Sequence, residues 1–228
     1  IRPPPISTLF PYTTLFRSYA DRLLKDLDGL EWSDGMKEMQ RDWIGRSEGA
    51  EVEFGIKDSE SKIRIFTTRP DTLFGATFLV LAPEHPLVRK ITRPEKLAGV
   101  EDYIKRSGSM AEVDRLNAER TKTGVFTGAM AVNPVNGKEI PIWIADYVMM
   151  GYGTGAIMCV PGHDSRDFEF ARKFNLPVVQ VVSRDGSRYQ LERAEPEEGI
   201  AVNSGEYDGL PTGEFKRRII EWLENRGI

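Results

Sequence analysis

The order of hydrophobic and polar positions in the first half of the chain predicts a β-hairpin. Residues 49–57 alternate between hydrophobic and polar side chains, and residues 62–69 repeat the alternation after a polar turn at Asp58–Ser61. A period of two is typical of a half-buried strand, because successive side chains point to opposite faces. Two such segments around a short turn therefore indicate an antiparallel pair.

The rest of the chain continues with short strands and interspersed helices. Apolar runs and alternating segments predict strands at 76–83, 123–148, 155–160 and 177–183, the second of them turning at Asn136-Gly137. Hydrophobic positions spaced three or four apart predict helices at 19–42, 94–108, 111–119, 164–175 and 213–226. Because no regular strand–helix–strand alternation is present, the pattern predicts an α/β fold with a β-barrel-like domain rather than a doubly wound sheet.

Residues 1–18 do not share this pattern. They carry two arginines and no acidic residue, and Pro4 and Pro5 interrupt any amphipathic helix. An acid-poor segment containing Arg and Ser is also found in organelle transit peptides. We interpret residues 1–18 as a non-native leader and exclude them from the fold prediction.

Composition and charge exclude several classes of protein. The 228 residues are 40% hydrophobic and 29% charged, with one Cys, two His and a net charge of −4. A single Cys allows neither an intrachain disulfide nor a cysteine zinc site, and no apolar run reaches the ~18 residues of a membrane span. We therefore expect no metal, no cofactor and no membrane contact. An acidic chain would hold a nucleic acid weakly, or mainly through another part of a larger protein.

Three polar constellations are candidates for chemistry. The first is the sequence TTRPDT at 67–72, where three hydroxyls, a guanidinium and a carboxylate follow a predicted strand. Such groups at a strand end can hydrogen-bond a substrate and orient a water molecule. The same residues are also compatible with a simple turn in which Asp71 or Thr72 caps the next helical turn.

The second constellation is the glycine-rich sequence GYGTGA at 151–156. A dinucleotide-binding fingerprint requires a helix to follow, whereas a strand ending at Pro161 is predicted here. The segment is better interpreted as a loop lining a pocket or as a bulge.

The third constellation is the start of the predicted helix at 164–175. Asp164 and Asp167 can share one face, where the partial positive charge of the helix N-terminus favours the ionised form, so the pair could hold an ammonium group. The alternative is that the same residues cap the helix. A metal site at His163 lacks further imidazoles, since His85 is the only other one. Cys159 lies in an apolar strand, which indicates an inert thiol.

The constellations belong to longer motifs: DWIGRSEG (42–49), TTRPDTLFGATF (67–78), LAPEHPL (81–87), GYGTGAIMCVPGHDSRDFEFA (151–171) and NSGEYDGL (203–210). Together these motifs resemble the editing insertion of bacterial-type leucyl-tRNA synthetases. The resemblance covers the chain from about Tyr19 to its end. It implies that residues 19–42 are a helical junction with the synthetase core and that residues 43–228 are the aminoacyl-tRNA editing domain.

The resemblance implies a hydrolase that corrects errors. A hydrophobic pocket gains only about 1–3 kcal/mol from one methylene, so a second site must remove wrong amino acids. The expected reaction is post-transfer hydrolysis of the ester of mischarged tRNA(Leu), in the cytoplasm. The chain has neither His-x-Gly-His nor Lys-Met-Ser-Lys-Ser, so it should not activate leucine. The expected partners are the tRNA 3′ end and the rest of the synthetase.

The resemblance also assigns roles by position. Thr72 matches the threonine that blocks the γ-branched leucine side chain, and Asp167 the aspartate that holds the α-ammonium. Thr67 and Thr68 match threonines that contact the ester and position water, and Arg69 would hold the terminal adenosine or the polar end of the substrate.

The remaining site residues would line the pocket: Tyr152, Met158, Val160 and His163. Asp164 would support the loop rather than react. Cys159 stands where a smaller residue is expected, and it would either narrow the pocket or pack in the core. Two other functions compete with that of an editing domain active as part of a synthetase. The chain could be a folded structural insertion that is inactive outside the full synthetase, or a free-standing hydrolase acting in trans.

Overall fold

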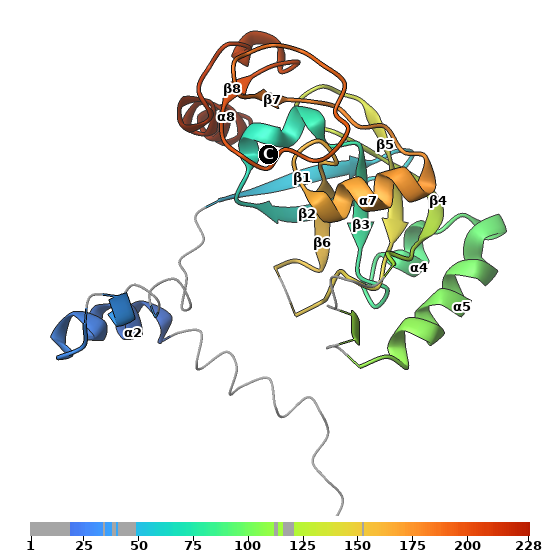
Figure 1. Ribbon diagram of the computed structural model, residues 1–228. Helices are drawn as coiled ribbons and strands as arrows, with labels where there is room; N and C mark the ends of the chain where they lie inside the picture. Colours follow the sequence, from blue (N-terminus) through green and yellow to red (C-terminus); the bar gives the residue numbers. More distant parts are fainter. Residues whose placement is uncertain are drawn as a thin grey trace, which may run out of the picture. The chain divides into compact units, whose positions relative to one another are not determined.

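The computed structural model describes residues 19–33, 35–37, 40, 49–111, 114–115, 121–151 and 153–228 (Figure 1). The chain divides into two compact units, residues 1–48 and 49–228. The expected leader at 1–18 lies outside the described residues. So does the segment 41–48, which contains the predicted domain boundary, and both therefore stay predictions.

The first unit is helical only in pieces. α2 (Ala20–Asp26) continues into the 3₁₀ turn η2 (Leu27–Gly29), and the chain is non-helical at 30–33 before short helical stretches follow. Helix was predicted over 19–42 with Gly29 and Gly35 punctuating it, and the interruption indeed comes directly after Gly29, a residue that favours helix ends. Leu27 is buried, whereas Leu23 and Leu30 on the same predicted stripe are exposed.

The second unit is built on a six-stranded sheet in the order β2-β1-β4-β5-β3-β6. Its strands are β1 (Ala50–Ile56), β2 (Lys62–Thr67), β3 (Phe78–Leu81), β4 (Val125–Val132), β5 (Glu139–Ile144) and β6 (Ala156–Cys159). Neighbours are antiparallel except β3 and β5, which are parallel. The edge strands β2 and β6 also lie against each other, so the sheet nearly closes on itself. The prediction of a barrel-like α/β domain is confirmed.

The predicted hairpin is present with the expected register. β1 and β2 pair from Ala50 with Thr67 to Gly55 with Lys62, and their buried positions alternate along both strands. Asp58 in the turn has φ 60°, a conformation that Asp and Asn tolerate better than most residues. The long segment at 123–148 likewise forms the hairpin β4–β5, with Gly137 at φ 68° in its turn.

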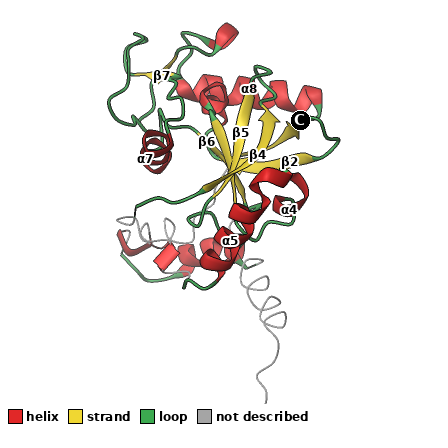
Figure 2. Ribbon diagram, turned by 90° about the vertical axis from the view of Figure 1, so that its right-hand side faces the viewer, coloured by secondary structure: helices red, strands yellow, loops and turns green. Residues whose placement is uncertain are grey.

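Two hydrophobic clusters hold the second unit together. The larger cluster unites the barrel interior with α5 (Leu97–Gly108) and α8 (Thr212–Arg226), and the smaller one packs α7 (Ser165–Phe174) against β3 and β6. Figure 2 shows the strands between α8 and α5, with α7 beside β6. Because β3 contributes to both clusters, all four of its side chains are buried, which explains its continuous apolar run.

Short elements complete the second unit. They are η3 (Pro70–Gly75), α4 (Val88–Ile91), η4 (Pro94–Lys96), η5 (Gly205–Tyr207) and the two-stranded sheet of β7 (Val182–Ser183) and β8 (Ile200–Ala201). The strand predicted at 177–183 is therefore reduced to its last two residues. Its backbone also contacts the turn before α7, because the Val181 and Val182 N–H groups donate to the side chain of His163 in that turn. The helix predicted at 111–119 lies mostly outside the described residues.

Candidate active site

A pocket of about 390 Å³ opens where β2 and β6 approach each other. One side, here called the hydroxyl wall, consists of residues 66–72, which join the end of β2 to η3. The other side, here called the carboxylate wall, consists of residues 157–167, which join β6 to the start of α7. The pocket is lined by Phe66, Thr67, Thr68, Arg69, Thr72, Ile157, Met158, Val160, His163, Asp164, Arg166 and Asp167.

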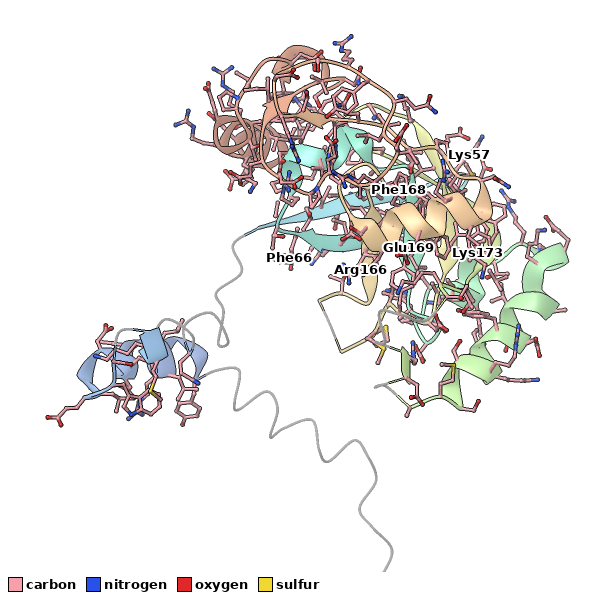
Figure 3. All side chains as sticks on the ribbon, in the orientation of Figure 1. Lys57, Phe66, Arg166, Phe168, Glu169 and Lys173 are labelled. Carbon is pink, nitrogen blue, oxygen red and sulfur yellow. The ribbon has the colours of Figure 1, made fainter. Side chains whose placement is uncertain are left out.

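The structure brings together nine of the ten residues selected from the sequence. They are Thr67, Thr68, Arg69, Thr72, Met158, Val160, His163, Asp164 and Asp167. Tyr152 lies outside the described residues. Sequence reasoning missed Phe66, Ile157 and Arg166. Phe66 was detectable, because it is a large apolar side chain at an outward position of an alternating strand. Figure 3 shows Phe66 on β2 and Arg166 at the start of α7.

The hydroxyl wall is organised by its own backbone. Thr67 Oγ1 accepts a hydrogen bond from the Arg69 N–H at 3.0 Å. Thr72 Oγ1 donates to the Arg69 carbonyl at 2.9 Å, and the Thr72 N–H reaches the same oxygen at 3.0 Å. Thr68 is exposed at the pocket. The three threonines therefore contribute hydroxyl and methyl groups without any charge.

Arg69 is engaged by the protein itself. Its Nε and Nη2 bind the carboxylate of Asp71 at 2.8–3.2 Å, and its Nη1 donates to the Pro196 carbonyl at 2.8 Å. Asp71 is completely buried, and this paired arrangement satisfies its charge. Arg69 was expected to hold the substrate. Because its guanidinium already binds Asp71 and Pro196, few of its N–H groups remain for that role.

The carboxylate wall turns tightly between β6 and α7. The N–H groups of His163 and Asp164 both donate to the Val160 carbonyl, at 2.9 and 3.0 Å. Asp164 is the N-cap of α7, accepting from the Arg166 and Asp167 N–H groups at 2.8 and 3.2 Å. It also pairs with the Arg166 guanidinium at 3.2 Å. The predicted helix cap at Asp164 is thus confirmed, and its role as a supporting rather than a reacting residue stays a prediction.

Asp167 is the buried acid of this wall. Its Oδ2 accepts from the Val160 N–H at 2.8 Å, and its carboxyl group also hydrogen-bonds the Cys159 thiol. In the described part of the chain, no cationic side chain lies within ion-pair distance of it. Burial, followed by repulsion from Asp164, raises the pKa of Asp167 to about 7. The sequence predicts that the helix N-terminus favours the ionised form of this carboxyl, whereas burial shifts its pKa in the opposite direction.

His163 has both ring nitrogens occupied. Nδ1 lies 2.7 Å from the Glu195 carbonyl, and Nε2 accepts from the Val181 and Val182 N–H groups at 2.9 and 3.0 Å. Since Nε2 is an acceptor, the ring is neutral and Nδ1 is the donor. Burial lowers the pKa of His163, which agrees with this assignment. His163 lines the pocket but offers it no free nitrogen.

Cys159 belongs to the core. It is buried in the smaller hydrophobic cluster, does not line the pocket, and lies 3.9 Å from the Tyr147 hydroxyl. Burial raises the pKa of its thiol well above the usual value, which confirms the inert thiol predicted from the sequence. Of the two alternatives for this residue, the structure supports packing.

Among the described residues, no cluster of three or more His, Cys, Asp or Glu side chains is suited to hold a metal ion. None of the described helices combines the length and apolar character needed to cross a membrane.

The chain is similar to known leucyl-tRNA synthetases. Residues 41–224 match the family described as "Leucyl-tRNA synthetase, editing domain". The leucine–tRNA ligase of Borrelia hermsii is 53% identical over 91% of this chain and 25% of its own length, and that of Rubrobacter xylanophilus is 54% identical over 92% and 26%. The chain thus spans about a quarter of these relatives.

A solved structure agrees with the sequence relatives. It is the ternary complex of the Agrobacterium radiobacter K84 agnB2 LeuRS with tRNA and LeuAMS. The similarity has a TM-score of 0.70 and 39% sequence identity, over 92% of this chain and 23% of the synthetase chain. With the family match covering most of the described fold and its pocket, the chain belongs to the editing-domain family of leucyl-tRNA synthetases.

Proposed function

We propose that the pocket hydrolyses the ester bond of mischarged tRNA(Leu) after transfer of the amino acid. The observation that supports this most is the buried Asp167 carboxyl, which has no cation partner in the described protein and faces a wall of threonines. An α-ammonium group would supply the missing positive charge. Every aminoacyl ester carries such a group next to its reactive carbonyl.

In the proposed step, a water molecule attacks the ester carbonyl. The water oxygen forms a bond to the carbonyl carbon, and the bond from that carbon to the ribose oxygen breaks. The water's protons end on the ribose oxygen and the solvent, so the products are the free amino acid and intact tRNA. Thr67 and Thr68 hold the ester and the water, and the neighbouring ribose hydroxyl of the substrate assists as the base. Catalysis then rests on positioning and on charge stabilisation.

Substrate selection is assigned to Thr72, with Met158 and Val160 completing the apolar surface. Because the Thr72 hydroxyl donates to the Arg69 carbonyl, its methyl group is the part left to meet a side chain of the substrate. We propose that this methyl group blocks the γ-branch of leucine and admits side chains without that branch. A steric block of this kind spares correctly charged tRNA.

The proposed partners are the 3′ end of tRNA(Leu) and the remainder of a synthetase. The solved relative is a synthetase in complex with tRNA, and this chain covers 23% of the length of that synthetase chain. The net charge of −4 over the whole chain gives it little electrostatic attraction for tRNA, so most of the tRNA binding is assigned to other parts of the enzyme. The cytoplasm, where tRNA is charged, is the proposed location.

The test is deacylation of isoleucyl-tRNA(Leu) by the chain and by Asp167→Ala. The proposal predicts hydrolysis by the wild type and a loss of at least about 100-fold in the variant, as expected for removing a charged contact to the reacting group. Asp58→Asn is the matched control, because Asp58 is exposed and its φ of 60° suits asparagine.

Full activity of a folded Asp167→Ala protein would overturn the proposed site. The competing function is that of a structural insertion that is active only within a complete synthetase. If that is correct, the isolated wild-type chain would be inactive even though circular dichroism shows that it is folded. Activity would return, and would again depend on Asp167, when the domain is placed in a full-length enzyme.

A further inference from the structure

Two consecutive residues that are not part of the pocket lining contact both of its walls. On the hydroxyl wall, Arg69 Nη1 donates to the Pro196 carbonyl at 2.8 Å. On the carboxylate wall, His163 Nδ1 donates to the Glu195 carbonyl at 2.7 Å, and the Glu195 N–H donates to the Gly162 carbonyl at 2.8 Å. We call Glu195–Pro196 the bridge.

The sequence of the bridge suits this arrangement. A residue that precedes proline favours an extended backbone, and proline restricts its own φ. Consecutive carbonyls of an extended chain point to opposite sides, so the Glu195 and Pro196 oxygens can serve two different walls. The Glu195 side chain is held as well, because the Tyr189 hydroxyl donates to its Oε2 at 2.6 Å. The bridge is therefore a restrained piece of backbone despite its position in an irregular segment.

Both side chains that hold the bridge have little capacity left for a ligand. The Arg69 Nε and Nη2 atoms bind Asp71, and its Nη1 binds the bridge. The His163 ring uses Nδ1 for the bridge and Nε2 for the Val181 and Val182 N–H groups. This pattern is that of residues that position other groups.

The contacts continue from the bridge to the two ends of the pocket. On one side, the Arg69 carbonyl accepts from both the N–H and the hydroxyl of Thr72. On the other side, His163 lies in the turn that leads to Asp164, whose side chain caps the helix carrying Asp167. The separation of Thr72 from Asp167 is thus tied to the bridge through hydrogen bonds on both walls.

We propose that the Glu195–Pro196 bridge sets the width of the pocket and thereby its selectivity, with Arg69 and His163 as positioning residues that act through it. This rests on the proposed editing function and adds to it a determinant outside the substrate-contacting residues. Loosening the bridge lets the walls separate, so that Thr72 no longer excludes leucine.

The first test compares His163→Ala with His163→Gln. Alanine removes both ring contacts, whereas the glutamine amide keeps a donor and an acceptor. The ratio of kcat/KM for leucyl- over isoleucyl-tRNA(Leu) should rise about tenfold or more in His163→Ala and return to within about threefold of wild type in His163→Gln. His85→Ala is the matched control, because His85 does not line the pocket. An unchanged ratio in His163→Ala overturns the proposal.

A second measurement does not need activity. The Val181, Val182 and Glu195 amides should exchange with solvent about tenfold faster in His163→Ala than in wild type or in His163→Gln. The methyl resonance of Thr72, on the opposite wall, should shift in the alanine variant and return in the glutamine variant. If neither responds, the bridge does not couple the walls. If both respond while the wild-type chain, alone and within a full-length enzyme, deacylates nothing, the coupling stands and the editing function fails.

Arg69 provides the same test from the other wall. Arg69→Ala removes the partner of the buried Asp71 and endangers folding, so Arg69→Lys is the informative variant. Lysine can keep one charged contact to Asp71, but it cannot also reach the Pro196 carbonyl in a forked geometry. We expect Arg69→Lys to raise the same selectivity ratio and to increase exchange at the Glu195 amide. A folded Arg69→Lys protein with wild-type selectivity and exchange contradicts the proposal.

Discussion

The two walls of the pocket each contain a buried aspartate, and the two aspartates differ in how their charge is met. Asp71 binds the Arg69 guanidinium through both of its oxygens. Among the described residues, Asp167 accepts from the Val160 N–H and the Cys159 thiol, and its pKa is raised to about 7. The charge of Asp71 is thus neutralised by an arginine, whereas no cationic side chain in the described part of the chain pairs with Asp167.

This difference separates structure from function. A buried ion pair with good geometry can hold a turn in place, but it has no charge to offer a ligand. A buried carboxyl without a cation costs stability, and it recovers that cost only when a positively charged ligand arrives. We therefore assign Asp71 to the architecture of the hydroxyl wall and Asp167 to the recognition of an ammonium group.

The largest expected effect comes from breaking the satisfied pair. Arg69→Ala leaves Asp71 buried without a partner and should lower the free energy of unfolding by about 3–5 kcal/mol. Urea unfolding measures this value. The double variant Arg69→Met with Asp71→Asn should recover a large part of the loss, because it removes both charges. An Arg69→Ala protein as stable as wild type would mean that Asp71 has another partner.

The opposite result is expected at Asp167. With a folded pKa near 7 and an ordinary value of 3.8, the unfolded chain loses this proton at lower pH than the native one. The native state is therefore penalised progressively as pH rises from about 4 to 7, and fully above 7. Asp167→Asn should raise the free energy of unfolding at pH 8 by on the order of 3 kcal/mol, and by little at pH 4. Equal destabilisation at both pH values would contradict the difference between the two acids.

The pH dependence of activity should follow from the same group. Only the ionised Asp167 carboxylate can bind an ammonium, so kcat/KM should fall about tenfold per pH unit below an apparent pKa near 7. Above about pH 8 the substrate's amino group loses its proton, so the profile should be bell-shaped and narrow. A flat profile from pH 5 to 7, measured by initial deacylation rates, would exclude Asp167 as the ammonium site.

A smaller change is expected at the gate on the hydroxyl wall. Thr72→Ala removes one methyl group and one hydroxyl, which changes selectivity by about 1–3 kcal/mol, or roughly 10–100-fold. The variant should hydrolyse leucyl-tRNA(Leu), while Thr72→Val, which keeps the shape, should continue to spare it. Loss of selectivity in both variants would indicate that the hydroxyl contact to Arg69, and not steric exclusion, is what matters.

The smallest effect is expected at the thiol behind Asp167. The hydrogen bond from Cys159 lowers the pKa of the Asp167 carboxyl, opposing its burial. In Cys159→Ala, the acid limb of the pH–rate profile should therefore move to higher pH by about half a pH unit. In Cys159→Ser, which keeps a donor, the limb should stay where it is. A downward movement of the limb in Cys159→Ala would show that the thiol disfavours the ionised acid.

Sequence patterns predicted most of the scaffold because local signals agreed with the tertiary fold. The β1–β2 hairpin follows from strict alternation, and α7 begins at the capping Asp164 as expected. The segment 177–183 has the hydrophobic pattern of a strand but forms one only at Val182–Ser183, and its N–H groups at 181 and 182 donate to the His163 side chain. That contact joins distant parts of the chain, and no local pattern reports it.

The residues selected from the sequence meet in one pocket, but their electrostatics were not predicted. The motif at 67–72 and the segment from Met158 to Asp167 line this pocket, and the roles that the resemblance implies for them stay predictions. The pairing of Arg69 with Asp71 was not foreseen, because a turn motif does not say which charges face each other. The raised pKa of Asp167 was also missed, because burial, its largest cause, depends on the packed core and cannot be seen in the local sequence.

The most direct test is a titration of the Asp167 carboxyl by carbon NMR, with and without a non-hydrolysable aminoacyl-adenosine analogue. The carboxyl should have a pKa near 7 in the free protein. This pKa should fall by at least about one unit with the analogue, but not with an analogue that lacks the amino group. A free carboxyl that titrates at its ordinary value, or one that responds equally to both analogues, would contradict the claim that Asp167 is kept for an ammonium ligand.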